Sequence, residues 1–181
     1  MNVRDAMPTI EDWKLLMTRT DTNLDTSTKE SFDKVTHLFA TNVDVQNHNK
    51  WCLRNLNCHV STSVSTKGSS NYTMEYKEDL ELELLIPVGA RVMLTSNIWT
   101  DFGLINGALV FVEQIVYDLG CLPPKPPTYV LIRFDNYVGF PWDESFPWTV
   151  SITPIERGSQ KQLPLKLVWG LTIHKSQGLT L

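Results

Sequence analysis

The chain has 181 residues, of which 42% are hydrophobic and 20% charged, and its formal net charge is −4. This composition is sufficient for a packed core and excludes an intrinsically disordered chain. The sequence contains neither a run of about 18 apolar residues nor a recognisable signal peptide, so it predicts no membrane span and no secretion. The acidic balance argues against a free-standing nucleic-acid-binding module, because such modules usually have a basic footprint.

The N-terminal part of the sequence predicts two helices. Thr9 and Asp12 have the spacing of a capping box, with Asp in place of the usual Glu or Gln. The apolar residues that follow recur at helical spacing, so residues 10–19 are expected to form an amphipathic helix. A polar loop separates it from a second short helix, which is expected at residues 28–34.

The next segments predict an α/β layer followed by an all-β region. Residues 37–42 are a short apolar run that ends in a polar residue, as a buried strand would, and residues 43–56 have helical periodicity. Residues 61–80 are interpreted as a polar linker, because Ser, Thr and Gly dominate their first part. Residues 81–157 contain β-branched and aromatic runs separated by Gly, Asn-Gly and Pro, which is typical of a small barrel.

Residues 158–181 predict a return to helix. Their apolar side chains fall on one helical face, with Pro164 in the first turn and Gly178 at the C-terminal cap. The residues that define this face are Leu165, Val168, Trp169, Thr172 and Ile173. A strand is the competing interpretation for the apolar part of the segment.

A polar cluster at the far end of this segment is a candidate site. Hydroxyl, imidazole, amine and amide groups gather there, in Thr172, His174, Lys175, Ser176 and Gln177. Such groups can hold phosphate oxygens of a nucleic-acid backbone. No window of the chain fits the G-x-x-x-x-G-K-[ST] phosphate-loop pattern, so the cluster does not predict a triphosphate site. An ordinary surface helix end is an equally open alternative.

The distribution of charge permits two interpretations of the C-terminal region. From Ser151 onward Glu156 is the only acid, against the bases Arg157, Lys161, Lys166 and Lys175. This segregation could form a local surface that faces phosphate. A solvated face without a ligand explains the same pattern, and charge alone favours it.

Two further groups of residues invite a functional interpretation that their surroundings argue against. A zinc site could be imagined from His48, Cys52, Cys58 and His59, but the gap between the cysteines departs from the usual two to four residues, so no metal is predicted. Base stacking could be imagined for Phe140, Trp142, Phe146 and Trp148. Asp143 and Glu144 lie among these rings and would repel phosphate, so packing is the favoured interpretation.

Three stretches of the sequence together resemble the Pif-type (petite integration frequency) DNA helicases of superfamily 1, subclass B, which include the Helitron transposon helicases. In chain order they are HLFATNVDVQNHN, PVGARVMLTSNIWTDFGLINGALVFV and LPLKLVWGLTIHKSQGLTL. The first resembles helicase motif IV, and TIHKSQGLTL resembles motif V. The resemblance covers most of residues 9–181. It implies an α/β fold, a partial RecA-like motor domain (2A) with an inserted small SH3-like β-barrel (2B).

The resemblance also implies an activity and roles for individual residues. The family unwinds DNA in the 5′-to-3′ direction with ATP and Mg²⁺, and 2A grips single-stranded DNA while completing the ATP site from the other side. By resemblance, DNA contact is expected from Thr172, His174, Lys175 and Ser176, with Asn42 lining the DNA path. Gln177 and Gly178 would relay the nucleotide state. Nuclear localisation, a monomer and a partner N-terminal RecA-like domain are implied as well.

Several family features are not found in these 181 residues. The Walker A lysine, the Walker B acidic pair, the Q-motif and the motif VI arginine are missing. The sequence is therefore expected to be the C-terminal 2A/2B portion of such a helicase, inactive alone and without a cofactor of its own. The turn at residues 104–107 is attributed to hairpin geometry rather than to DNA contact.

Two alternatives stay open at the level of sequence. The first is a non-catalytic SH3-like module that binds a protein or a nucleic acid. The second is a piece of a RecD-type recombination helicase, which shares the same layout.

Overall fold

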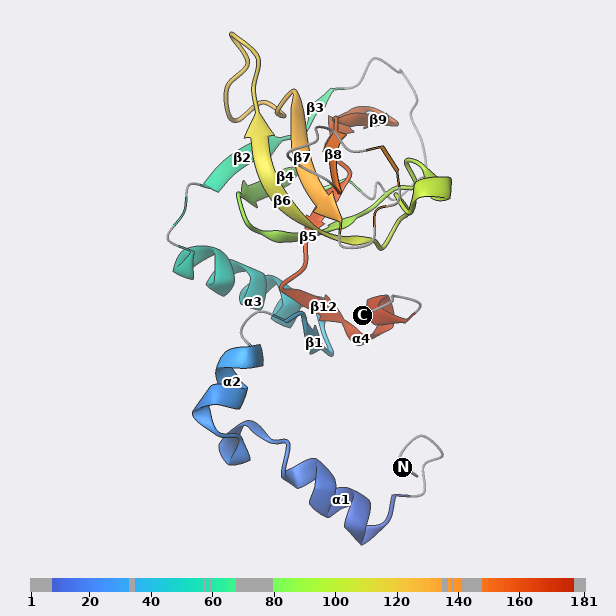
Figure 1. The fold of residues 1–181 in the computed structure, drawn as a ribbon. Helices are drawn as coiled ribbons and strands as arrows, with labels where there is room; N and C mark the ends of the chain where they lie inside the picture. Colours follow the sequence, from blue (N-terminus) through green and yellow to red (C-terminus); the bar gives the residue numbers. More distant parts are fainter. Residues whose placement is uncertain are drawn as a thin grey trace. The chain divides into compact units, whose positions relative to one another are not determined.

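The computed structural model describes residues 8–32, 35–56, 58, 60–67, 80–134, 137, 139–140 and 148–177. The chain divides into two compact units, Met1–Thr36 and His37–Leu181 (Figure 1). None of the helices in the described ranges is both long enough and apolar enough to cross a membrane.

The first unit contains two short α-helices, α1 (Ile10–Met17) and α2 (Thr26–Phe32), with the 3₁₀ turn η2 (Asp21–Asn23) between them. The predicted capping box is confirmed: the Asp12 amide donates to Thr9 Oγ1 at 3.2 Å, and the Thr9 amide donates to Asp12 Oδ2 at 3.0 Å. The box satisfies two amides at the helix start that have no partner within the helix. Neither α1 nor α2 has a buried side chain among the described residues.

The second unit contains a small α/β layer built from both ends of its sequence. Strand β1 (His37–Phe39) pairs in parallel with β12 (Gly170–Thr172). Helix α3 (Asn42–Asn55) follows β1, and the short helix α4 (Ile173–Ser176) follows β12 (Figure 1). The strand and the helix predicted for residues 37–56 are thus confirmed to within a few residues at each end.

The rest of the second unit is rich in antiparallel strands. An open five-stranded sheet has the order β11-β5-β6-β7-β8, a three-stranded sheet has the order β3-β10-β9, and β2 pairs with β4. The strands are β2 (Val60–Val64), β3 (Thr66–Lys67), β4 (Glu83–Pro87), β5 (Arg91–Leu94), β6 (Leu109–Val116), β7 (Tyr129–Phe134), β8 (Thr149–Ile152), β9 (Ile155–Arg157), β10 (Gln160–Gln162) and β11 (Leu165–Leu167); the 3₁₀ turn η3 (Thr100–Phe102) follows β5.

These strands enclose the principal hydrophobic core. Its fully buried members come from strands of all three antiparallel sheets or their borders, and they include Ile86, Val92, Leu94, Val110, Ile132, Ile152, Leu163 and Leu165. A smaller cluster of Met93, Val168 and Leu171 lies where the β-rich region meets the α/β layer. Because Val168 and Leu171 belong to the segment that leaves the β-rich region, the two parts share buried contacts.

The structure differs from the expectation of a closed barrel at residues 81–157. Within the described ranges, β11 and β8 are the two edges of the five-stranded sheet, and no pairing joins them. The sheet also includes β11, which lies after residue 157, in antiparallel register with β5. A mixed α/β architecture with an open antiparallel sheet is therefore observed.

The helix predicted across Leu165–Ile173 is wrong. Leu165–Leu167 pairs with β5 and Gly170–Thr172 pairs with β1, so the segment forms two strands, and a short helix begins only at Ile173. Residues buried on two faces can imitate helical spacing, since nearly every position is apolar. Gly170 disfavours a helix interior by about 1 kcal/mol relative to Ala, and sheet pairing decides the conformation.

The loop predicted from residue 61 is also wrong in its first part, where β2 pairs with β4. Alternate residues of β2, Ser61 and Ser63, are buried. Ser63 Oγ donates to Gln162 Oε1 at 2.6 Å, and Gln162 Nε2 returns a bond to the Ser63 carbonyl at 2.9 Å. Serines with buried partners can thus form a strand that resembles a linker by composition.

Candidate functional site: a groove between α3, β4 and β12

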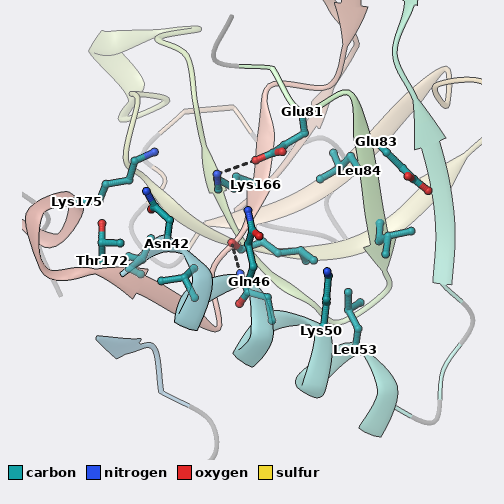
Figure 2. Close-up of a pocket in the computed structure, with 15 residues that line it drawn as sticks. Asn42, Gln46, Lys50, Leu53, Glu81, Glu83, Leu84, Lys166, Thr172 and Lys175 are labelled. Atoms are coloured by element: carbon teal, nitrogen blue, oxygen red, sulfur yellow. Dashed lines mark hydrogen bonds and ion pairs between the residues drawn. The ribbon is translucent and has the colours of Figure 1, made fainter. Parts of the chain in front are cut away.

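A groove of about 480 Å³ lies in the second unit, between helix α3 and the start of the β-rich region (Figure 2). Five segments contribute to it: α3, the residues around β4, strand β11, strand β12 and helix α4. The lining residues are Asn42, Val45, Gln46, Asn49, Lys50, Leu53, Glu81, Glu83, Leu84, Leu85, Lys166, Leu167, Leu171, Thr172 and Lys175.

Three of the predicted site residues line this groove: Asn42, Thr172 and Lys175. The parallel register places Phe39 opposite Thr172, so the carboxyl ends of β1 and β12 meet at one edge. Residues that follow neighbouring parallel strands come together at such an edge, which is where α/β folds bind ligands. Asn42 begins α3 and Lys175 lies in α4, and Figure 2 shows both near Thr172 at one end of the groove. Asn42 and Lys175 are exposed, whereas Thr172 is buried.

The other predicted residues do not line the groove. His174 is exposed in α4. Ser176 donates its hydroxyl to the Ile173 carbonyl at 2.7 Å, within its own helix turn. Gln177 is exposed at the end of α4, and Gly178 lies outside the described residues. Of the predicted cluster, the groove therefore brings together Thr172 and Lys175 only, and the others are not among its lining residues.

Asn49, which the sequence analysis did not single out, fastens α3 to β12. Its Oδ1 accepts the Gly170 amide at 2.9 Å, and its Nδ2 donates to the Leu167 carbonyl at 3.4 Å. These bonds hold the helix against the segment that carries Thr172 and Lys175. The available signal in the sequence was spacing, since Asn49 lies two helical turns after Asn42.

Gln46 and Lys50 are two more groove residues that the sequence analysis missed. Both are exposed on α3 and follow Asn42 at intervals of four residues. At 1.5 Å of rise per residue, this spacing places polar groups about 6 Å apart along one face of the helix. In Figure 2 their side chains lie on successive turns, with Lys50 at the opposite end of the groove from Lys175.

The groove has an uneven charge. Lys166 Nζ lies 2.7 Å from Glu81 Oε1, and the side chains are 36% and 38% exposed (Figure 2). Within the described part of the chain, neither Lys50 nor Lys175 has an ion-pair partner. The C-terminal bases do not form one continuous surface: Lys161 lies in a different hollow, and Arg157 donates to Ser96 Oγ at 2.8 Å.

His48 and Cys52 of the rejected zinc set lie together on helix α3, within the α/β layer. Cys52 Sγ is 3.6 Å from His48 Nε2, and the His48 ring packs against His37 and Phe39. Burial, and then the charge of His37, lower the pKa of His48, while burial raises the pKa of the Cys52 thiol. The described residues include no group of three side chains able to hold a metal; Cys58 is exposed, and His59 lies outside the described residues.

The described residues of the remaining motifs do not line the groove. The packing interpretation is wrong for Phe140 and Trp148, whose side chains are 81% and 53% exposed. Trp142 and Phe146 lie outside the described residues. In the 104–107 turn Leu104 is buried, the Asn106 amide donates to Asn97 Oδ1 at 2.7 Å, and Gly107 has φ of 93°. That positive φ is a conformation which glycine adopts without strain.

Solved structures share this fold. Unliganded Pif1 from Bacteroides sp has a TM-score of 0.64 and 25% identity, and the match covers 99% of this chain and 40% of that chain. Bacteroides Pif1 bound to ssDNA has a TM-score of 0.62 and 25% identity, and the match covers 99% of this chain and 39% of that chain. These neighbours show that the chain has the mixed α/β fold of a RecA-like helicase.

Curated relatives narrow the class to a family, although no protein-family profile matches the chain. The mouse ATP-dependent DNA helicase PIF1 is 30% identical over 126 residues, which are 68% of this chain and 18% of the relative. The human protein of that name is 38% identical over 101 residues, which are 54% of this chain and 14% of the human protein. The chain thus matches less than a fifth of the length of these relatives. By sequence and by fold, it belongs to the Pif1-type helicases.

Proposed function

We propose that this chain is the C-terminal portion of an ATP-dependent 5′-to-3′ DNA helicase and that its groove holds single-stranded DNA. The supporting observation is that Asn42, Thr172 and Lys175, expected separately from two motifs, line one groove. Gln46 and Lys50 extend the same polar track along α3.

The chemistry of this track suits a nucleic-acid backbone. Lysine ammonium groups act as point charges for phosphate, and amide side chains donate hydrogen bonds to phosphate or sugar oxygens. Such contacts position a strand without reading its sequence, as a motor that moves along DNA requires. The spacing of about 6 Å between Asn42, Gln46 and Lys50 lets successive groups contact successive nucleotides of an extended strand.

In this proposal the α/β layer of β1, α3, β12 and α4 is part of the 2A motor domain, and the β-rich region corresponds to the inserted 2B module. A second RecA-like domain would supply the groups that bind ATP and Mg²⁺. Gln177, at the end of α4, and Gly178, which follows it in the sequence, would relay the nucleotide state from that partner. The whole enzyme would act as a nuclear monomer.

Strand binding can be measured by fluorescence anisotropy with a labelled oligothymidylate over a range of salt concentrations. Lys50→Gln and Lys175→Gln are each expected to weaken binding, because each removes one phosphate contact. Each should also reduce the salt slope by about 0.7. Lys161→Gln is the matched control, since Lys161 is exposed but lies in a different hollow. Equal losses in all three variants, or no binding by the parent chain, would contradict the proposed groove.

A further inference from the structure

One of the three lysines in the groove differs from the other two, because it already forms an ion pair with an acid of the same groove. Lys166, on β11, and Glu81, just before β4, form the 2.7 Å ion pair. Both side chains line the groove and more than a third of each is exposed. Lys50 and Lys175 line the same groove with no ion-pair partner among the described residues.

A carboxylate and a phosphate compete for the same donor. The Glu81 carboxylate presents two anionic oxygens to the Lys166 ammonium, as a strand phosphate would. An exposed ion pair of this kind is weak, so an incoming phosphate can displace it at small cost. While the pair persists, Lys166 adds little to the field that attracts a strand, and Glu81 repels any phosphate that approaches it.

We propose that Glu81 is an affinity-determining residue of the groove, acting as a built-in competitor for the phosphate that Lys166 would otherwise bind. This inference rests on the proposed binding of single-stranded DNA. In addition, Glu81 keeps the affinity for the strand below the value that Lys50, Lys166 and Lys175 could together provide. A weaker grip suits a site that must release the strand repeatedly, because the free energy of binding that Glu81 removes need not be overcome at each step.

The test is a double-mutant cycle on the full 181-residue chain with the labelled oligothymidylate. Glu81→Gln is expected to tighten binding about two- to fivefold, the range that the weakness of exposed ion pairs implies. It should also steepen the salt slope by about 0.7, because one more phosphate contact forms. In a Lys166→Gln background the same change should bring much less gain, because the lysine that it would release is gone.

Glu83→Gln is the matched control. Glu83 is an exposed acid of the same groove, and no ion pair of Glu83 is seen in the described part of the chain. Its neutralisation changes the groove's charge equally but releases no lysine, so its effect should be small and independent of Lys166. Glu81→Ala provides a second variant if Glu81→Gln alters the unfolding transition.

The outcomes separate the two proposals. Equal gains from Glu81→Gln and Glu83→Gln in both backgrounds would overturn the competitor role and leave strand binding intact. A parent chain and variants that all fail to bind, despite unchanged unfolding transitions, would overturn the proposed function itself. A gain confined to Glu81→Gln with Lys166 present would support both.

Discussion

Asn49 joins helix α3 to strand β12 with its side-chain oxygen and to the end of β11 with its side-chain nitrogen. The Gly170 amide and the Leu167 carbonyl that it contacts belong to the chain segment that crosses from the β-rich region to the α/β layer. Gly170 itself is buried, so its amide would have poor access to water without this partner. A single side chain therefore fixes the helix that carries Asn42, Gln46 and Lys50 against the strand that carries Thr172.

We expect Asn49→Ala to destabilise the chain by about 1–3 kcal/mol, because it leaves a buried amide without a hydrogen bond. Urea unfolding followed by circular dichroism measures the change. Gln46→Ala is the control, since Gln46 is exposed on the same helix and should change the free energy of unfolding by no more than about 0.5 kcal/mol. Equal effects of the two substitutions would show that the Asn49 amide contributes nothing to the packing of α3 on β12.

At the scale of the elements, strand β12 depends on the absence of a side chain at Gly170. A Cβ atom at this position would lie 2.9 Å from Phe39 Cε2 and 3.3 Å from His48 Cδ2. Carbon atoms do not approach each other to 2.9 Å without displacement, so any larger residue would have to shift either the Phe39 ring or strand β12 itself. The close approach of these elements thus requires glycine for reasons of space.

Gly170→Ala is therefore expected to cost about 1–3 kcal/mol of stability, the usual range for overpacking. The same substitution in a Phe39→Ala background should cost less, because the ring atoms that the new methyl group meets are gone. Denaturant unfolding of the four chains in this cycle tests the claim. An equal cost in both backgrounds would locate the strain elsewhere than at the Phe39 ring.

Local signals in the sequence predicted the elements near the N-terminus and failed at the C-terminal segment. Helix α1 carries its own capping box, and α3 follows a recognisable strand, so each could be predicted from neighbouring residues. The conformation of Leu165–Thr172 depends on β5 and β1, which are distant in sequence. The resemblance to motifs IV and V predicted Asn42, Thr172 and Lys175 as site residues. The ion pair of Glu81 with Lys166 joins residues that are distant in sequence, so only the structure revealed it.

At the scale of the whole molecule, the described parts contain the groove that we propose binds a strand, but no phosphate loop. The 181 residues include no G-x-x-x-x-G-K-[ST] sequence. Phosphoryl transfer depends on several groups positioned together around the nucleotide. A polypeptide that carries only some of these groups therefore has little activity. Within the proposed function, strand binding and ATP hydrolysis are therefore separable properties, and this polypeptide has the first.

We expect this 181-residue polypeptide to show no ATP turnover above background, with or without single-stranded DNA. A coupled assay for ADP release at several protein concentrations measures it. Turnover that persists through successive purification steps and scales with the amount of this chain would contradict the expectation. A contaminating ATPase would instead separate from the protein during purification.

The parallel pairing of β1 with β12 also has a consequence for biosynthesis. Phe39 leaves the ribosome before Gly170, which follows only after the entire β-rich region has been translated. At about 5–20 residues per second this delay is on the order of ten seconds. Throughout that time β1 and α3 can pack on each other, but β1 has no strand to pair with and the α3 residues that contact β12 stay uncovered. Nascent chains with such uncovered surface are the ones that chaperones engage.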